Sequence, residues 1–364
     1  MKNILLLFTL IVLLPGCKKD DPIIIDIPDD YFKNGVYVTI DPRMELLAVV
    51  QHFTTWANDH HTNLNFDYVN EVENYFSSFS QHPAINKCQE LIDNGFTYDA
   101  PVNYILFHDY PPELRRMAPY SDYLTGRARG VTNLADFADK LRDFATKTDF
   151  MSFYDSCKTF YNETLTLAFN TLGNMNYIEL MEDYYGDTKY KYIIIPTPLF
   201  DGGGYGPRVD LPEGQYVYNV LGPTRLNNGI PAFGKESDFK HILLHEFSHS
   251  FVNPLTEKNI DEVNKSSGLF EPIKEKMKEQ AYSSWYVCVN EHLVRINVIR
   301  MRIKSEGESI KDDLMEYEKS RSFIYISQLD TLMQSYESNR SEYPTYEDFY
   351  PEIINLFNTL ADLN

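Results

Sequence analysis

Residues 237–254, SDFKHILLHEFSHSFVNP, restrict the possible structures of this chain more strongly than its size does. Ser237 is a residue type that caps helices, and Asp238 suits a first turn. Pro254 predicts the end of the helix. The helix would be apolar around most of its circumference, through Ile242, Leu243, Leu244, Phe247 and Phe251. We therefore expect a helix buried within the domain.

Two histidines and a glutamate stand together on this predicted helix. His245 and His249 are about one turn apart, so they project from the same face and could each bind one Zn²⁺ through a ring nitrogen. Glu246, about 100° round the helix, could reach a metal-bound water as general base. The alternative is two core histidines bonded to neighbours. Burying these groups without partners would be costly, and a metal removes that cost.

This pattern resembles the active-site helix of the zincin metallopeptidases, in which an apolar residue, here Phe251, stands two beyond the second histidine. The metzincin branch would need Gly and His where Val252 and Leu255 stand. The gluzincin branch takes its third ligand from a Glu on a later helix, often in an Asn-Glu pair. Asn290-Glu291 is such a pair, so the resemblance implies Glu291 as the third zinc ligand.

Other carboxylates compete with this assignment. The competing third ligands, in or just beyond a predicted polar loop over 256–268, are Glu257, Glu262 and Glu271. Arg295, four residues after Glu291, predicts a helix-surface ion pair as another role for Glu291. Gluzincins often have an acidic residue near that position, so Arg295 departs from the family pattern.

Several further side chains are candidates for supporting roles. His292 could donate a hydrogen bond to a metal ligand, donate to the transition state or be an ordinary packed imidazole. It cannot easily bind the same metal as Glu291, because neighbours on a helix diverge by about 100°. His241, one turn before His245, is expected to flank the site. The tyrosines that could stabilise an oxyanion are Tyr205, Tyr282 and Tyr286.

The first residues indicate export. Lys2 precedes an apolar run over 4–14 that is too short to span a bilayer stably, which is typical of a signal peptide over 1–16. Leu14-Pro15-Gly16-Cys17 resembles a bacterial lipobox, which implies acylation of Cys17 and a lipid anchor. Residues 18–21, KKDD, resemble the tract that marks surface-exported lipoproteins in Bacteroidota-type bacteria. We expect an outer-membrane lipoprotein at the cell surface; the alternative is an ordinary secreted protein.

Charge and composition exclude several classes of partner. Without Lys2 the chain has 32 basic and 53 acidic side chains, a net charge of 32 − 53 = −21, which does not favour nucleic acid or anionic lipid. The Gly-rich residues 201–207 lack the flanking pattern of a phosphate-binding loop, so we predict a flexible loop and no nucleotide. The cysteines after Cys17 are Cys88, Cys157 and Cys288, compatible with one disulfide plus a thiol or with three buried thiols.

The remaining pattern predicts a mostly helical α+β fold with a small sheet beside the 245–249 helix. After a tether over 17–30 we expect one zincin-like domain, 31–364, with a helical N-terminal part, 31–185, and a catalytic part, 186–364. The predicted strands are 37–40, 191–195 and 216–221. The predicted helices are 43–58, 69–79, 83–94, 133–150 (capped by Asn133), 153–172, 272–303, 312–335 and 351–363, while 102–107 could be strand or helix.

Residues 41–47 (DPRMELL) and the late HEFSHSFVNP together resemble an uncharacterised lipoprotein family, domain of unknown function 4932. The resemblance implies a zincin-like fold and no known substrate. With the zinc motif, it leads us to expect a zinc metallopeptidase that hydrolyses extracellular or periplasmic proteins. The alternative is a surface binding lipoprotein with a structural or degenerate zinc site, which would not need Glu246.

Overall fold

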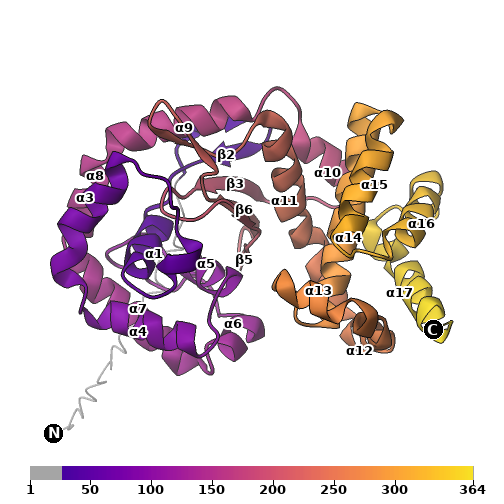
Figure 1. Ribbon diagram of the computed structural model, residues 1–364, viewed down its shortest axis with the longest axis horizontal. Helices are drawn as coiled ribbons and strands as arrows, with labels where there is room; N and C mark the ends of the chain where they lie inside the picture. The colour runs from indigo at the N-terminus through magenta and orange to yellow at the C-terminus, as the bar shows by residue number, and fades with distance from the viewer. Residues whose placement is uncertain (1–26, 364) are drawn as a thin grey trace, which may run out of the picture.

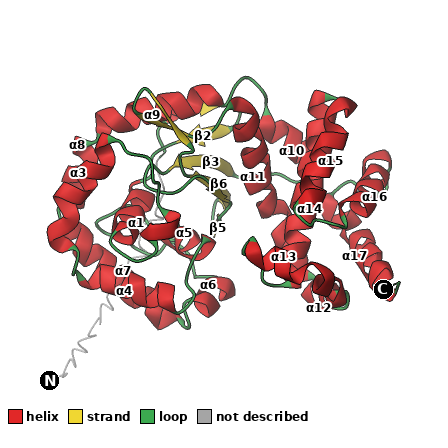
Figure 2. Ribbon diagram, in the orientation of Figure 1, coloured by secondary structure: helices red, strands yellow, loops and turns green. Residues whose placement is uncertain are grey.

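The computed structural model describes residues 27–363 of the 364-residue chain. The predicted signal peptide and Cys17 lie outside these residues. The described part is mostly helical with two small sheets, which confirms the α+β class (Figure 2). Among these residues, no helix combines the length and apolar character needed to cross a membrane.

The first half of the chain is a series of helices. They are α1 (Pro42–His52), α2 (Ala57–His60), α3 (Asp67–Phe76), α4 (Pro83–Asp93), α5 (Asp99–Ile105), α6 (Asp122–Arg127), α7 (Val131–Lys147), α8 (Phe150–Ser156), α9 (Lys158–Thr171) and α10 (Tyr177–Tyr185), with the short 3-10 helices η1 (Asp29–Tyr31) and η2 (Ser77–Phe79). The ambiguous segment 102–107 is therefore mainly helical. The cap of α7 is Gly130, so the prediction that Asn133 caps this helix is wrong.

The main sheet combines strands from both ends of this helical series. Its strands are β1 (Phe32–Lys33), β2 (Val36–Val38), β3 (Lys191–Pro196), β4 (Gly204–Tyr205), β5 (Arg208–Leu211) and β6 (Gly214–Leu221), in the order β1-β2-β3-β6-β4 with β5 also on β6. β2, β3 and β6 run parallel, whereas β1, β4 and β5 are antiparallel to their neighbours. Helices α1 to α10 are thus an excursion between two adjacent parallel strands, and the two predicted parts of the domain share one sheet. A separate hairpin is formed by β7 (Arg225–Asn227) and β8 (Ile230–Ala232).

The central strands follow directly from their composition. Residues 192–196 of β3 are buried without interruption, as are residues 216–221 of β6. A continuous run of β-branched and aromatic residues is typical of parallel strands that are covered on both faces. These two strand predictions are confirmed.

The helix with the two histidines lies in the middle of the molecule. It is α11 (Glu236–Lys258), and it packs against β6 on one side and α14 (Trp285–Glu306) on the other. Figure 1 shows helices α3, α4, α7, α8 and α9 in an arc on one side of α11 and helices α14 to α17 on the other.

The C-terminal part is more helical than predicted. After α11 it contains α12 (Ile260–Asn264), η3 (Ser267–Ile273), α13 (Lys274–Glu279), α14, η4 (Glu308–Ile310), α15 (Lys311–Ser320), α16 (Ile326–Ser338) and α17 (Tyr346–Asp362). The predicted polar loop over 256–268 is wrong, because most of it is helical. The two helices predicted after residue 311 are three.

Two helix boundaries, at the end of α11 and between α13 and α14, differ from the predicted ones for identifiable reasons. Pro254 does not end α11, although an interior proline costs about 3 kcal/mol. The next turn is held by Thr256, a fully buried residue whose hydroxyl lies 2.7 Å from that of Tyr350. The predicted helix over 272–303 is broken between α13 and α14. Ala281 takes a left-handed conformation with φ of 69°, and the Ser284 hydroxyl then caps α14.

The cysteine alternatives are also resolved. Cys88, Cys157 and Cys288 are free and buried. Burial raises the pKa of the Cys88 thiol to about 12, so this thiol stays protonated and packs as a small apolar group. The three cysteines therefore contribute to the core, and within residues 27–363 they form no disulfide.

Candidate metal centre

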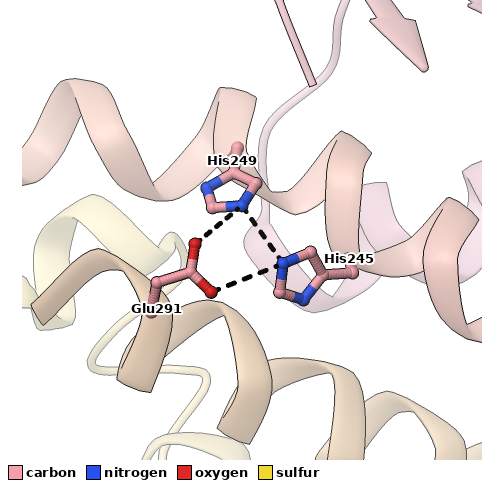
Figure 3. Close-up of side chains that lie close together, drawn as sticks. All are labelled: His245, His249 and Glu291. Atoms are coloured by element: carbon pink, nitrogen blue, oxygen red, sulfur yellow. Dashed lines mark hydrogen bonds and ion pairs between the residues drawn. The ribbon is translucent and has the colours of Figure 1, made fainter. Parts of the chain in front are cut away.

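The side chains of His245, His249 and Glu291 converge between two packed helices. Both histidines come from one face of α11, and Glu291 comes from α14 (Figure 3). The two Nε2 atoms are 3.3 Å apart. Glu291 Oε2 lies 3.6 Å from His245 Nε2, and Glu291 Oε1 lies 3.5 Å from His249 Nε2.

These separations fit a single metal ion. Two ligand atoms that each lie about 2.0–2.1 Å from a tetrahedral zinc stand about 3.4 Å from each other. The two Nε2 atoms are 3.3 Å apart, and those of His245 and His249 lie 3.6 and 3.5 Å from different oxygens of Glu291. Two imidazole nitrogens and a carboxylate are also a donor set that zinc accepts, with a position left for water. The side chains therefore fit a zinc ion.

The hydrogen bond of His249 and the burial of His245 both suit metal binding through Nε2. His249 Nδ1 lies 3.1 Å from Asn253 Oδ1, so Nδ1 carries the proton and Nε2 has a free lone pair. Burial, assisted by the positive charge of Arg295, keeps the pKa of His245 well below its usual value. Sequence reasoning did not identify Asn253, although its position four residues after His249 on the same helix face could have indicated it.

Glu246 is placed beside the edge of the main sheet. A Cβ atom at Gly204 would lie 3.0 Å from Glu246 Oε1, and one at Gly206 would lie 2.2 Å from the Glu246 backbone oxygen. Gly204 and Tyr205 form an edge strand, β4, packed closely on α11, so the predicted loop is wrong for these two residues and confirmed as a connection between strands for the rest of 201–207. Burial raises the pKa of Glu246 to about 7, so its carboxylate can accept a proton near neutral pH.

The competing carboxylates lie elsewhere. All three are exposed and pair with lysine or arginine: Glu257 with Arg208 at 3.4 Å, Glu262 with Lys265 at 2.7 Å and Glu271 with Lys274 at 3.1 Å. Among residues 27–363, the one group of three candidate ligands found within metal-binding reach is His245, His249 and Glu291. The geometry therefore favours Glu291 as the third ligand.

Arg295 pairs with Glu291, but in the interior of the protein. Its Nη2 donates to Glu291 Oε2 at 3.0 Å and to the Tyr282 hydroxyl at 3.1 Å. The Arg295 side chain is only 4 % exposed, so the predicted surface ion pair is wrong in its location. Pairing with Arg295 and facing the histidines are not alternatives, because Glu291 does both.

The remaining candidates are placed less centrally. His292 Nδ1 contacts the Cys288 carbonyl at 2.7 Å, and its ring packs on Phe323 and Tyr325. This surrounding is that of a packed imidazole, and burial lowers its pKa to about 4. His241 stacks on His245 with ring centroids 6.2 Å apart, as expected for a flanking residue.

The tyrosines differ in their surroundings. The Tyr282 hydroxyl accepts a hydrogen bond from Arg295 Nη2. Burial raises the pKa of Tyr286, and the Asn290 side chain beside it acts in the opposite direction. Tyr205 follows Gly204 on the edge strand, and its raised pKa reflects first burial and then the negative charges of Asp201, Asp99 and Glu246. Tyr205 and Tyr282 are therefore the tyrosines with electrostatic contact to Glu246 and Glu291, respectively.

One contribution from the N-terminal helices was not predicted. Asp99, the first residue of α5, interacts electrostatically with both His249 and Glu246. Its carboxylate accepts hydrogen bonds from the Tyr123 hydroxyl at 2.9 Å. The helices inserted between β2 and β3 therefore reach the neighbourhood of the metal centre.

A comparison with protein families shows to which family this chain belongs. The family described as "Domain of unknown function (DUF4932)" matches residues 36–114 and 126–356. The chain belongs to this family. No curated protein and no solved structure matches it. The DUF4932 match spans strands β2 to β6 of the main sheet, α11 and α14, so it includes every residue of the candidate metal centre.

Proposed function

We propose that this DUF4932 protein is a zinc-dependent metallopeptidase with a zincin-like, gluzincin-type site. The observation that carries the proposal is the convergence of His245, His249 and Glu291 at separations suited to one zinc ion, with Glu246 adjacent. The site is assembled from two helices and would leave the fourth ligand position open, as catalytic zinc sites do.

In this proposal His245, His249 and Glu291 hold the metal. Zinc, when bound, would polarise a peptide carbonyl and lower the pKa of a water toward about 7. Glu246 accepts the proton from the attacking water on its carboxylate and delivers it to the leaving amine nitrogen. The raised pKa of Glu246, about 7, suits a group that must both take and release a proton near neutral pH.

The edge of the sheet supports a peptide as the substrate. β4 pairs antiparallel with β6 and ends the strand order, and Gly204 and Gly206 bring it against Glu246. An extended peptide can add to such an edge through main-chain hydrogen bonds. A chain bound there would run beside the proposed general base, as substrates do in zincins.

Glu246→Gln tests the reaction, because it keeps the shape of the side chain and removes the base. The variant should retain zinc and fold while losing cleavage of a broad peptide library by about 10²–10⁴-fold. Glu257→Gln, which alters an exposed carboxylate on the same helix, is the matched control and should cleave normally. If the wild type cuts nothing and Glu246→Gln binds the same partners equally well, the protein is a surface binding lipoprotein instead.

We also propose that an acylated Cys17 anchors the protein in the outer membrane, facing the cell surface. Only the sequence supports this part, through the signal-peptide pattern and the Leu-Pro-Gly-Cys resemblance. Cys17→Ser should release the protein from the membrane fraction. Full retention would contradict the anchor, and protease treatment of intact cells would show which side the domain faces.

A further inference from the structure

Glu291 is the first member of a buried chain of charges. Arg295 donates from Nη2 to Glu291 Oε2 at 3.0 Å and from Nη1 to both carboxylate oxygens of Glu318 at 3.2 and 3.1 Å. The side chains of Arg295 and Glu318 are 4 % and 2 % exposed. Glu318 lies on α15, outside both helices that carry the candidate ligands.

Both terminal nitrogens of the Arg295 guanidinium have hydrogen-bond partners, whereas its buried Nε has none within residues 27–363. Besides the two carboxylates, Arg295 donates to the Tyr282 hydroxyl at 3.1 Å, and its guanidinium lies over the Phe323 ring at 4.3 Å from the centroid. Hydrogen bonds in fixed planar geometry leave an arginine few alternative orientations. Arg295 bonds Oε2 of Glu291, which also lies 3.6 Å from His245 Nε2, and this contact sets the carboxylate so that Oε1 faces His249 at 3.5 Å.

The charges also require the third member. An arginine beside a site for a divalent cation would oppose binding of that cation, and the opposition is stronger in a buried site than in water. Glu291 and Glu318 together carry two negative charges against the one positive charge of Arg295. The three side chains of this charge triad together therefore have one net negative charge, which offsets part of the positive charge that Arg295 and the nearby Arg321 bring to the site.

We propose that Glu318 is a positioning residue for the metal centre: it holds Arg295 against one oxygen of Glu291 and offsets the guanidinium charge. This inference rests on the metal site of the proposed function. It assigns a role in zinc binding to α15, a helix that carries none of the three candidate ligands.

The test is zinc affinity, measured by competition with a chromogenic chelator on the purified domain. Glu318→Gln keeps the shape of the side chain and removes its charge, so it should weaken zinc binding by about 10- to 100-fold. Glu318→Asp, which keeps the charge but shortens the side chain, should give a smaller loss. If Glu318→Gln does not fold, the zinc affinity of Glu318→Asp is the measurement that tests the inference.

The chain offers a matched control on the same helix. Arg300 of α14 pairs with Asp330 of α16 at 3.1 Å, and both side chains are 8 % exposed. Asp330→Asn removes a buried carboxylate from an α14 arginine without touching Glu291. It should lower the melting temperature and leave zinc affinity unchanged.

The outcomes separate this inference from the proposed function. Zinc binding that is equal in Glu318→Gln, Asp330→Asn and the wild type, with lowered melting temperatures in both variants, would show that Glu318 is only structural. A wild type that binds no zinc would instead overturn the metal site itself. Selective weakening in the Glu318 variants is the result expected from the charge triad.

Discussion

Two pairs of histidines approach each other almost equally closely in this protein, and only one has the surroundings of a metal site. In the pair on α11, the Nε2 atoms of His245 and His249 are 3.3 Å apart. In the pair at the end of α1 and just after α2, the Nδ1 atoms of His52 and His61 are 3.4 Å apart. Both pairs are largely shielded from solvent.

The carboxylate makes the difference. Glu291 faces both rings of the first pair, whereas Glu73 contacts only the outer nitrogen, Nε2, of His52 at 3.5 Å. The second pair therefore forms a chain of hydrogen bonds, which we assign from its partners, and His61 Nε2 is left buried without a partner among the described residues. His61 Nδ1–H donates to His52 Nδ1, and His52 Nε2–H donates to Glu73. Two close imidazoles alone do not make a metal site. A carboxylate that faces both rings distinguishes the first pair from the second.

The largest effect should come from removing that third ligand. Glu291→Ala is expected to reduce the metal content of the purified protein from about one zinc per chain to none. His61→Gln, which disrupts the other pair, should keep its zinc. Metal analysis by mass spectrometry measures both. If Glu291→Ala retained zinc while Glu257→Ala released it, the ligand assignment and the comparison would both fail.

A smaller effect is expected on stability. A ligand that binds only the folded state at a concentration 100 times its Kd stabilises that state by about 2.7 kcal/mol. Chelation with EDTA should therefore lower the melting temperature of the wild type and of His61→Gln by the same amount. Glu291→Ala should show no such shift. An equal shift in all three proteins would mean that zinc binds somewhere other than the first pair.

The two pairs also show what the sequence can predict. His245, Glu246 and His249 were identifiable because the spacing of side chains along a helix is fixed locally. Glu291 required a resemblance to a known family, since no local rule connects α11 with α14. The approach of His52 to His61 was not predictable, because it depends on how the chain folds back after α1. The bridge of His61 to Phe200 joins this pair to the segment just before the edge strand β4.

Tertiary contacts account for the other failures. Arg295 was recognisable four residues after Glu291, but its burial depends on α15, which brings Glu318 to it. Pro254 predicted a helix end on local grounds, and the contact of Thr256 with α17 outweighs it. The strands β3 and β6 were predictable because each is a continuous run of mostly apolar residues, which is typical of a buried strand. Side-chain pairs between distant helices leave no such pattern in the sequence.

The smallest expected effect concerns the pH dependence of stability and distinguishes the second pair. Burial lowers the pKa of His61 to about 3, whereas the unfolded chain has the ordinary value of about 6.5. The unfolded state therefore binds the proton first as pH falls, and the stability that His61 contributes is complete above pH 6.5 and is lost toward pH 3. Between pH 6.5 and 5.5 this single group should reduce the free energy of unfolding by about 1 kcal/mol.

Urea unfolding of zinc-free protein at several pH values would measure this dependence. His61→Gln cannot take up the proton, so its free energy of unfolding should fall less steeply than that of the wild type over the same interval. The zinc-free form is needed because protonation of His245 and His249 would otherwise compete with metal binding and steepen the profile. Parallel profiles for wild type and His61→Gln would mean that His61 becomes protonated in the folded state as readily as in the unfolded chain.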